Sequence, residues 1–551
     1  MVQIDRGFSS SLKRSYISVA IALIAVAAIG LSTVGRVGIT YDEEGPLRVA
    51  FENYKIVTEG RQYPGHLKYY GTLFNGVSEI VFQKTQQIFR TDFPKQDRYE
   101  GRGYSIYPFY GRVKIKHVLT FLLSLFAYGS VAGMVGILSG AEFAWLGPIV
   151  LALFPRFWGH SFFNPKDIPL AAAMTLGTFV GVCWVGYCHC IAGDADCSFG
   201  LNRLTFYAFA YGALLGCVAG IRLDGSAVLL FVAIAHFISS LRQISPANWL
   251  RRFWPFYGLM GLTWMAVTIL VYPSSWSNPL PWFWETLQFY YREDWPLTVL
   301  FEGAYLSAQN LPWHYLPKWF SITIPVLWQG AFWLGLGWIG WRYRALTPIQ
   351  RACIVAVALQ IFVLPAIAIA LQSTIYDEAR QFLYAVPGIA VIAATTLAWL
   401  YRTLASKRAK LFGVALAIAL LSPIVADAIA LHPYEYLYFN RAFGGLAKAQ
   451  GQFETDYWAA SMRENMEWVN RNVASESAIV SSDPLYASAP FAKSGLRVID
   501  IAEFESAKVR KPFYYVAIPR WDFQQRFPDC ETVHQVKRQG VPLSIVKKCS
   551  E

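Results

Sequence analysis

The sequence predicts a polytopic α-helical membrane protein of about 11 transmembrane helices, followed by a small C-terminal α/β domain outside the membrane. Three observations predict this class. The chain of 551 residues is 55% hydrophobic and 15% charged, and its mean hydropathy is +0.33, whereas a soluble chain of this length carries far more charge. Apolar runs of membrane-spanning length recur as far as residue 431. The remaining segment, 432–551, has only short apolar runs.

The predicted spans begin close to the N-terminus. Residues 16–35 carry no charge and are long enough to cross a bilayer. We interpret them as an uncleaved signal anchor, since further spans follow and the run is long for a cleaved signal peptide. The predicted spans are 16–35, 117–138, 141–158, 168–189, 204–220, 225–241, 255–272, 319–340, 352–371, 382–401 and 411–431.

Lysine and arginine are distributed asymmetrically between the connecting segments. Alternate segments, beginning with residues 1–15, hold 14 basic residues in total, whereas the short turns of the other set hold only Arg156, Lys166, Arg222 and Arg380. The positive-inside rule therefore predicts a cytoplasmic N-terminus and an extracytoplasmic C-terminus, in what we take to be a bacterial inner membrane. The net charge of +12 reflects this topology and contact with anionic membrane lipid, and we predict no nucleic-acid partner.

Two long loops are predicted on the outer side. The loop 36–116 contains two helical patterns, at 43–60 and 73–90, and the second places its apolar residues on one face, as in a helix that lies in the membrane interface. The loop 273–318 is rich in tryptophan. Tryptophan prefers the headgroup level, so this loop is either an aromatic belt or a cover over a lipid-linked substrate.

The C-terminal segment reads as one compact α/β domain. Four short apolar runs, at 478–480, 497–500, 513–518 and 544–546, predict strands, and helical patterns lie near 457–472 and 503–508. We divide the chain into a membrane domain, 1–440, and an extracytoplasmic domain, 441–551. Cys530 and Cys549 are the only cysteines of this domain, so we expect a disulfide between them, with free thiols as the alternative. No catalytic motif is visible in the domain, and we expect it to handle the acceptor or contact a partner.

Charged residues gather in the short outer turns. Tyr41-Asp42-Glu43-Glu44 follows the first span, and similar clusters lie at 164–169, 222–225 and 376–381. Charges close to hydrocarbon are costly unless they are paired or functional. One interpretation is that the clusters simply neutralise one another. The other is a shared outer cavity in which basic residues hold an anionic headgroup and a carboxylate accepts a proton.

These clusters carry a resemblance to a known family. The chain resembles the GT-C glycosyltransferases, in the branch that contains the protein O-mannosyltransferases and the lipid A aminoarabinose transferase. The resemblance covers roughly residues 1–440 and rests on four segments in order. They are Asp42-Glu43 with Arg48, His66-Leu67-Lys68-Tyr69-Tyr70-Gly71, Asn164-Pro165-Lys166-Asp167-Ile168-Pro169, and Arg380-Gln381-Phe382-Leu383-Tyr384-Ala385-Val386-Pro387.

The resemblance implies transfer of a sugar from a polyprenyl-phosphate donor to an acceptor hydroxyl on the outer face, with inversion. It implies a catalytic role for Asp42 as the general base, with Glu43 beside it. It implies donor-phosphate binding by Lys68, Arg380 and Arg48. Substrate orientation would fall to Asp167, Lys166, His66 and Tyr69. The sugar is not implied, nor whether the acceptor is a glycan, a lipid or a protein.

We predict no cofactor. Some members of this family use a divalent metal, but no convincing ligand set is present, and Cys188, His189, Cys190 and Cys197 are loosely spaced at a helix end. A transporter or flippase for a lipid-linked or anionic substrate is the alternative function. A receptor that binds a partner through its C-terminal domain is a third, but it leaves the Asp42 cluster unexplained.

Overall fold

The structure is a computed structural model of the chain, and it describes residues 6–61, 65–94, 97–101, 104–193, 200–291 and 296–550. Within these ranges, nine helices are long and apolar enough to cross a membrane. They are α1 (Arg6–Val34), α4 (Phe109–Ser139), α7 (Asp167–Gly193), α8 (Gly200–Ile221), α9 (Ala227–Ser240, with the turn that precedes it), α10 (Pro246–Val271), α14 (Pro348–Ala370), α15 (Ala385–Thr403) and α16 (Lys407–Leu431). The predicted fold class, a polytopic helical membrane protein with a C-terminal domain, is confirmed.

The span predicted at 319–340 is broken. Helices α12 (Tyr315–Thr323) and α13 (Val326–Arg342) meet at an angle of 113°. Ile324 between them is extended, with φ −84° and ψ 133°, because the ring of the following Pro325 disfavours the helical conformation at the residue before it. If the pair counts as one span, the described residues contain up to ten.

The span predicted at 141–158 is wrong. The segment forms the short helices α5 (Leu146–Ala152) and α6 (Pro155–His160). Phe154 is extended directly before Pro155, which is again the conformation that a following proline imposes. All six residues of α6 are buried, so its apolar side chains pack inside the protein.

The two long loops predicted on the outer side contain helices and hairpins. Helices α2 (Glu44–Glu59) and α3 (Leu73–Phe89) confirm the helical patterns predicted at 43–60 and 73–90. The loop after α10 contains α11 (Pro279–Tyr291). Two hairpins were not predicted: β1 (Tyr99–Gly101) with β2 (Tyr104–Ile106), and β3 (Thr298–Phe301) with β4 (Ala304–Ser307).

The C-terminal domain is built on a five-stranded sheet. The strands are β5 (Ala478–Ser481), β6 (Arg497–Asp500), β7 (Phe513–Ala517), β8 (Glu531–Arg538) and β9 (Val541–Cys549), in the order β6-β5-β7-β9-β8. Strand β5 runs parallel to β6 and β7, and β9 runs antiparallel to β7 and β8. The short helix α17 (Gly445–Ala449) and the helix α18 (Met462–Asn472) precede the sheet.

The sequence predicted the α/β composition of this domain and four of its five strands. Met462, Met466 and Val469 of α18 pack on Ile479 and Val546 of the sheet. Strand β8 was missed because its sequence, Glu-Thr-Val-His-Gln-Val-Lys-Arg, is mostly polar. The helix predicted near 503–508 is wrong, since the structure has only a 3-10 turn at Ile501–Glu503.

A disulfide joins Cys530, directly before β8, to Cys549 at the end of β9. The two cysteines are 19 residues apart, and closing a loop of this size in the unfolded chain is worth about 3 kcal/mol. We therefore expect Cys530→Ser/Cys549→Ser to lower the thermal midpoint of the C-terminal domain under non-reducing conditions. Two reactive thiols in protein purified from its native membrane without reductant would contradict the pairing.

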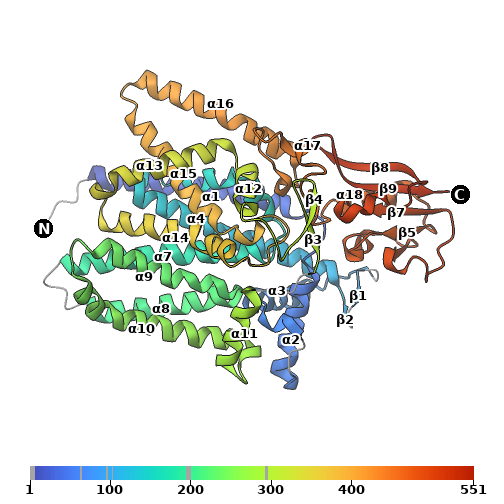
Figure 1. Cartoon of the computed structure of the whole chain (residues 1–551), viewed down its shortest axis with the longest axis horizontal. Coiled ribbons are helices and arrows are strands. Elements are labelled where there is room, and N and C mark those ends of the chain that lie inside the picture. Colours follow the sequence, from blue (N-terminus) through green and yellow to red (C-terminus); the bar gives the residue numbers. More distant parts are fainter. Residues whose placement is uncertain are drawn as a thin grey trace.

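The polar elements gather at one end of the helical bundle. Figure 1 shows the C-terminal sheet, the hairpin of β3 and β4, and helices α2 and α3 at this end, while the N-terminus lies at the other. The turns that precede α2, α7, α9 and α15 also meet here, as the ion pairs described below establish. The charged turns that the sequence placed on one side of the membrane therefore converge.

Candidate active site

The centre of the site is Arg380, whose guanidinium contacts three carboxylates. Its nitrogens lie 3.1 Å from Asp42, 2.9 Å from Asp167 and 3.2 Å from Asp377. The Arg380 side chain is 2% exposed. Arg380 lies in the segment that connects α14 to α15. A buried arginine is held in place when its planar donors are matched by acceptors, so these carboxylates fix Arg380 against its own turn and two other segments of the chain.

Lys166 completes the surroundings of Asp42. Its ammonium lies 3.2 Å from the Asp42 carboxylate and 5.1 Å from the ring centroid of Tyr70. Asn164 positions the turn, because its side-chain oxygen accepts from the backbone N–H groups of Lys166 and Asp167. This Asn-Pro-Lys-Asp turn therefore directs its lysine to Asp42 and its aspartate to Arg380.

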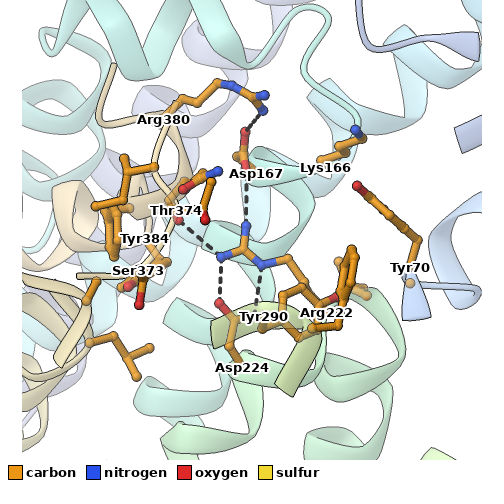
Figure 2. Close-up of a pocket in the computed structure, with 18 of the residues that line it drawn as sticks. Tyr70, Lys166, Asp167, Arg222, Asp224, Tyr290, Ser373, Thr374, Arg380 and Tyr384 are labelled. Atoms are coloured by element: carbon orange, nitrogen blue, oxygen red, sulfur yellow. Dashed lines mark hydrogen bonds and ion pairs between the residues drawn. The ribbon is translucent and has the colours of Figure 1, made fainter. Parts of the chain in front are cut away.

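A second arginine extends the cluster. Arg222 donates to Asp167 at 3.1 Å and to the two carboxylate oxygens of Asp224 at 2.9 and 2.5 Å. Figure 2 shows Asp167 lying between Arg380 and Arg222, with Asp224 on the far side of Arg222. Acid and base thus alternate from Asp42 to Asp224.

This row of charges forms one end of a cavity of about 350 Å³. The charged end is lined by Lys166, Asp167, Arg222, Asp224 and Arg380. The rest of the wall is largely apolar and includes Leu287, Phe289, Leu364, Ile367 and Leu371. Asp42 lies behind Lys166 and Arg380 and is 19% exposed. The cavity therefore fits a molecule with an anionic head and an apolar body.

The electrostatics of Asp42 favour its ionised form. Burial alone would raise the pKa of Asp42, but the charges of Lys166 and Arg380 outweigh burial and lower it. Asp42 therefore carries its negative charge at neutral pH, as a proton acceptor must. Any change that moves Lys166 away from Asp42 will raise the pKa of this carboxyl and strengthen it as a base.

The three carboxylates of the acidic cluster after α1 have different partners. Glu43, predicted beside Asp42 as a second catalytic carboxylate, is buried and points elsewhere, with its carboxylate 2.6 Å from Nε2 of His117 and 3.0 Å from the Thr40 hydroxyl. Arg48, predicted to bind donor phosphate, pairs with Glu44 one turn earlier in α2, at 3.0 Å. Neither Glu43 nor Arg48 lines the cavity. The helical geometry of α2 explains the pairing, since residues four apart share a face.

The segment 65–71 contributes only uncharged residues to the lining of the cavity. Lys68, predicted as a phosphate ligand, lies 2.9 Å from Glu285 in α11. Tyr69 donates to the same carboxylate at 2.8 Å, and His66 stacks on Phe289. The residues of this segment that line the cavity are Tyr70 and Gly71. The structure thus brings together Asp42, Lys166, Asp167 and Arg380 but places Lys68, His66 and Tyr69 against α11.

Several residues of the cluster had no predicted role. Arg222, Asp224 and Asp377 lie in the charged turns that the sequence analysis identified, so their place near the site could have been predicted. Nothing in the sequence pointed to Arg520, which belongs to the C-terminal domain. Its guanidinium lies 2.5 Å from Asp377 and 3.8 Å from Glu454. Its side chain is 2% exposed.

Glu454 gives the buried cluster a titratable group near neutral pH. Burial raises the pKa of Glu454 from 4.5 to about 7, with Arg520 opposing and Asp377 assisting. The folded protein therefore holds this proton more tightly than the unfolded chain. The resulting stability is fully present below pH 4.5, decreases as the pH rises and is lost above about pH 7. Its size is roughly 3 kcal/mol.

We accordingly expect Glu454→Gln to remove this part of the pH dependence. Between pH 5 and pH 8, the thermal midpoint of the wild type should fall relative to that of the variant. Glu302→Gln is a suitable control, since Glu302 is 43% exposed and pairs with Lys318, which lowers its pKa and keeps its titration below this range. Parallel midpoint curves for the wild type and Glu454→Gln would contradict the assignment.

Among the residues that the structure describes, no group of three or more His, Cys, Asp or Glu side chains is arranged to hold a metal ion. Cys197, considered above with Cys188, His189 and Cys190, lies outside those residues.

Comparison with known proteins shows the fold. No protein-family model matches the sequence, and no curated protein matches it. Among solved structures, the archaeal oligosaccharyltransferase AglB from Archaeoglobus fulgidus, in complex with an inhibitory peptide and a dolichol-phosphate, is similar to this chain with a TM-score of 0.52 and 13% identity, over 91% of this chain and 69% of AglB. ArnT from Cupriavidus metallidurans, bound to undecaprenyl phosphate, is similar with a TM-score of 0.48 and 15% identity, over 97% of both chains. The likeness to AglB shows that the chain has the GT-C fold predicted from its sequence.

Proposed function

We propose that this protein is an integral membrane glycosyltransferase that moves a sugar from a polyprenyl-phosphate donor to an acceptor hydroxyl. One observation carries the proposal: the cavity joins a charged lining, in which Lys166 and Arg222 are partly exposed beside the ionised Asp42, to an apolar wall. A polyprenyl phosphate has the matching chemistry, an anionic head on a hydrocarbon chain. The shared fold adds support, because the AglB structure contains dolichol-phosphate.

The donor phosphate would bind Lys166 and Arg222. Both side chains line the cavity and keep some exposure, 20% and 18% respectively. Arg380 is almost fully buried behind them, so in this proposal it holds the carboxylates in place and adds positive potential. This refines the assignment made from the sequence, since Lys166 takes the place of Lys68. The polyprenyl chain would follow the apolar wall along Leu364, Ile367 and Leu371 of α14 and its C-terminal end.

Donor binding would also activate the base. The ammonium of Lys166 contacts Asp42 in the structure, and a phosphate in the cavity competes for that ammonium. As Lys166 turns to the phosphate, Asp42 loses a stabilising charge and its pKa rises. The carboxylate then accepts the acceptor's hydroxyl proton more readily. Lys166 would in this way couple occupation of the donor site to the strength of the base.

The transfer itself would be a single displacement. The acceptor oxygen attacks the anomeric carbon as its proton passes to Asp42. The bond from that carbon to the phosphate oxygen breaks, and its electron pair stays on the phosphate, whose growing charge Lys166 and Arg222 stabilise. Attack from the side opposite the phosphate inverts the anomeric centre. In the predicted topology the reaction takes place on the outer face of a bacterial inner membrane.

The function can be tested without knowledge of the acceptor. Purified protein in nanodiscs would be incubated with a panel of synthetic undecaprenyl-phosphate monosaccharides labelled in the sugar, with detergent extracts of cell-envelope lipid, glycan and protein as acceptors. We expect one donor to release undecaprenyl phosphate and to pass its label to one extract. Asp42→Asn protein is the control. Absence of cleaved product with every donor and every extract would contradict transfer.

We expect Lys166→Met to weaken binding of undecaprenyl phosphate by about tenfold, the effect of one charge-assisted contact to phosphate. Lys68→Met is the matched control, since Lys68 is a lysine of the same end of the protein that pairs with Glu285 outside the cavity lining. Its effect should stay within about twofold, as for an exposed ion pair. Binding can be followed by quenching of intrinsic tryptophan fluorescence in nanodiscs. A larger loss in Lys68→Met than in Lys166→Met would return the phosphate to the site predicted from the sequence.

A further inference from the structure

Two consecutive residues, three and two positions before Arg380, have left-handed backbone conformations. Asp377 has φ 54° and Glu378 has φ 66°. Residues with a Cβ adopt this region rarely, and they keep it where the surrounding structure holds them there. The groups that hold this turn therefore also determine where Arg380 points.

The turn is held from two sides. On one side, the Asp377 carboxylate lies 2.5 Å from Arg520 and 3.2 Å from Arg380. On the other side, the Glu378 carboxylate pairs with Arg156 and lies 3.1 Å from Nε2 of His160. Arg156 and His160 belong to the membrane domain, whereas Arg520 comes from the C-terminal domain, as does Tyr457, whose hydroxyl also donates to Glu378.

Arg520 is itself fixed by contacts from both domains. It donates to the backbone carbonyl of Tyr457 at 3.1 Å and stacks near the rings of Tyr41 and Trp521, with its Cζ atom 5.3 and 4.3 Å from their centroids. Its side chain is 2% exposed. A buried guanidinium with these contacts delivers one positive charge to Asp377 at a defined position.

The same domain holds the segment that carries Asp42, which is an independent observation. Arg463 of α18 donates to the backbone carbonyls of Gly35 at 2.6 Å and Val37 at 3.3 Å. The backbone N–H of Tyr41 donates to the carbonyl of Trp458 at 3.0 Å. The segment that ends in Asp42 is thus bound along its length to the C-terminal domain.

The approach is closest at Gly38 and at Tyr41. A Cβ atom at Gly38 would lie 2.4 Å from the backbone oxygen of Ala460. The Tyr41 hydroxyl donates to Asp483, and the Tyr486 hydroxyl donates to the Tyr41 carbonyl. Side chains of the C-terminal domain therefore contact both segments that meet at the Asp42–Arg380 ion pair.

From these contacts we infer that Arg520 is a positioning residue and that the C-terminal domain completes the active site. Arg520 neutralises Asp377, which leaves Arg380 free to contact Asp42 and Asp167. Without Arg520, Asp377 depends on Arg380 alone and draws its guanidinium away from the other two carboxylates. The inference concerns the geometry of the site and depends on the proposed function only through the ligand used in one arm of its test. It replaces the expectation that the domain only handles the acceptor or contacts a partner.

The test compares four variants of the full chain in nanodiscs: Arg520→Met, Arg520→Lys, Asp377→Asn, and the double variant Asp377→Asn/Arg520→Met. Asparagine tolerates the left-handed conformation, so the double variant removes both charges with little change of backbone. Arg538→Met is the control, since Arg538 is a partly buried arginine of the same domain that pairs with Glu464.

The first readout needs no ligand. We expect amide hydrogen exchange of residues 372–384 to rise roughly tenfold in Arg520→Met, to fall back towards the wild type in Arg520→Lys and in the double variant, and to stay unchanged in Arg538→Met. If Arg520→Met acted only through a general loss of stability, exchange would also rise in Arg538→Met. Exchange would then rise further in the double variant. Unchanged exchange of this segment in folded Arg520→Met overturns the inference.

The second readout is the binding of undecaprenyl phosphate. We expect it to weaken about tenfold in Arg520→Met and to recover to within about threefold of the wild type in the double variant. Equal affinity in Arg520→Met and the wild type, or no recovery in the double variant, contradicts the role of Arg520. If the wild type itself binds no undecaprenyl phosphate, the proposed function fails, while the exchange measurement still decides the role of Arg520.

Discussion

Asp42→Asn is expected to lower sugar transfer at least about a hundredfold, the usual contribution of a general base, while the protein inserts and folds. Asparagine has nearly the same size as aspartate but accepts no proton at neutral pH. Arg380 keeps two other carboxylates, Asp167 and Asp377, at 2.9 and 3.2 Å, so the substitution leaves no buried arginine unpaired. The measurement is the initial rate of label transfer in nanodiscs, normalised to folded protein.

Glu43→Gln is the matched control for this experiment. It removes the neighbouring carboxylate, which contacts His117 and Thr40 outside the cavity lining, and we expect a smaller loss of rate. Undecaprenyl phosphate should still bind to Asp42→Asn, because Lys166 loses a competing partner. Turnover of Asp42→Asn close to that of the wild type would rule out Asp42 as the base.

Arg380→Met should have the largest effect on stability. Arg380 is buried among Asp42, Asp167 and Asp377, and removing one member of a buried ion cluster leaves its partners uncompensated at a cost of about 3–5 kcal/mol. Arg380→Lys keeps the charge but loses the planar fork that reaches three carboxylates, so we expect an intermediate loss. The measurement is the thermal midpoint in nanodiscs, together with the yield of folded protein.

Arg402→Met provides the comparison for Arg380→Met. Arg402 also pairs with a carboxylate, Glu142, but both side chains are about half exposed, at 50% and 55%. Exposed pairs contribute about 0–1 kcal/mol, so the midpoint of this variant should stay near that of the wild type. Similar midpoints for Arg380→Met and Arg402→Met would show that the buried cluster does not stabilise the fold.

The site residues in the membrane domain were predictable because they interrupt the apolar pattern of the sequence. Asp42, Lys166, Asp167 and Arg380 are charges at the ends of long apolar helices, and the distribution of basic residues places those ends on one side of the membrane. Topology places these residues on the same side of the membrane, whereas their meeting in one ion-pair cluster depends on the tertiary structure. The helices α2 and α3 and most strands of the C-terminal domain were predictable from periodicity for similar reasons.

Ion pairs whose partners are set by tertiary packing were not predictable. Lys68 pairs with Glu285, which lies 217 residues further along the chain, and no periodic pattern connects two loops. The broken spans at 141–158 and 319–340 have the composition of membrane helices, and only the local effect of Pro155 and Pro325 divides them.

The contacts of Arg520 in the C-terminal domain were not predictable for the same reason. It lies in a polar turn among other charged residues, and its function depends on how the domain docks on the membrane helices. A domain without a catalytic motif of its own can still supply a residue to the site of its neighbour. The absence of a motif gave no information on the contacts of this domain with the Asp377 turn.

The most direct test of the account is an electron cryo-microscopy structure of the full chain in nanodiscs with undecaprenyl phosphate. We expect density for the phosphate at the charged end of the cavity, in contact with Lys166 and Arg222, and density for the chain along α14. We also expect Lys166 to have moved from Asp42 towards the phosphate. A phosphate bound at Lys68 and Glu285, or at the opposite end of the helical bundle, would contradict the account.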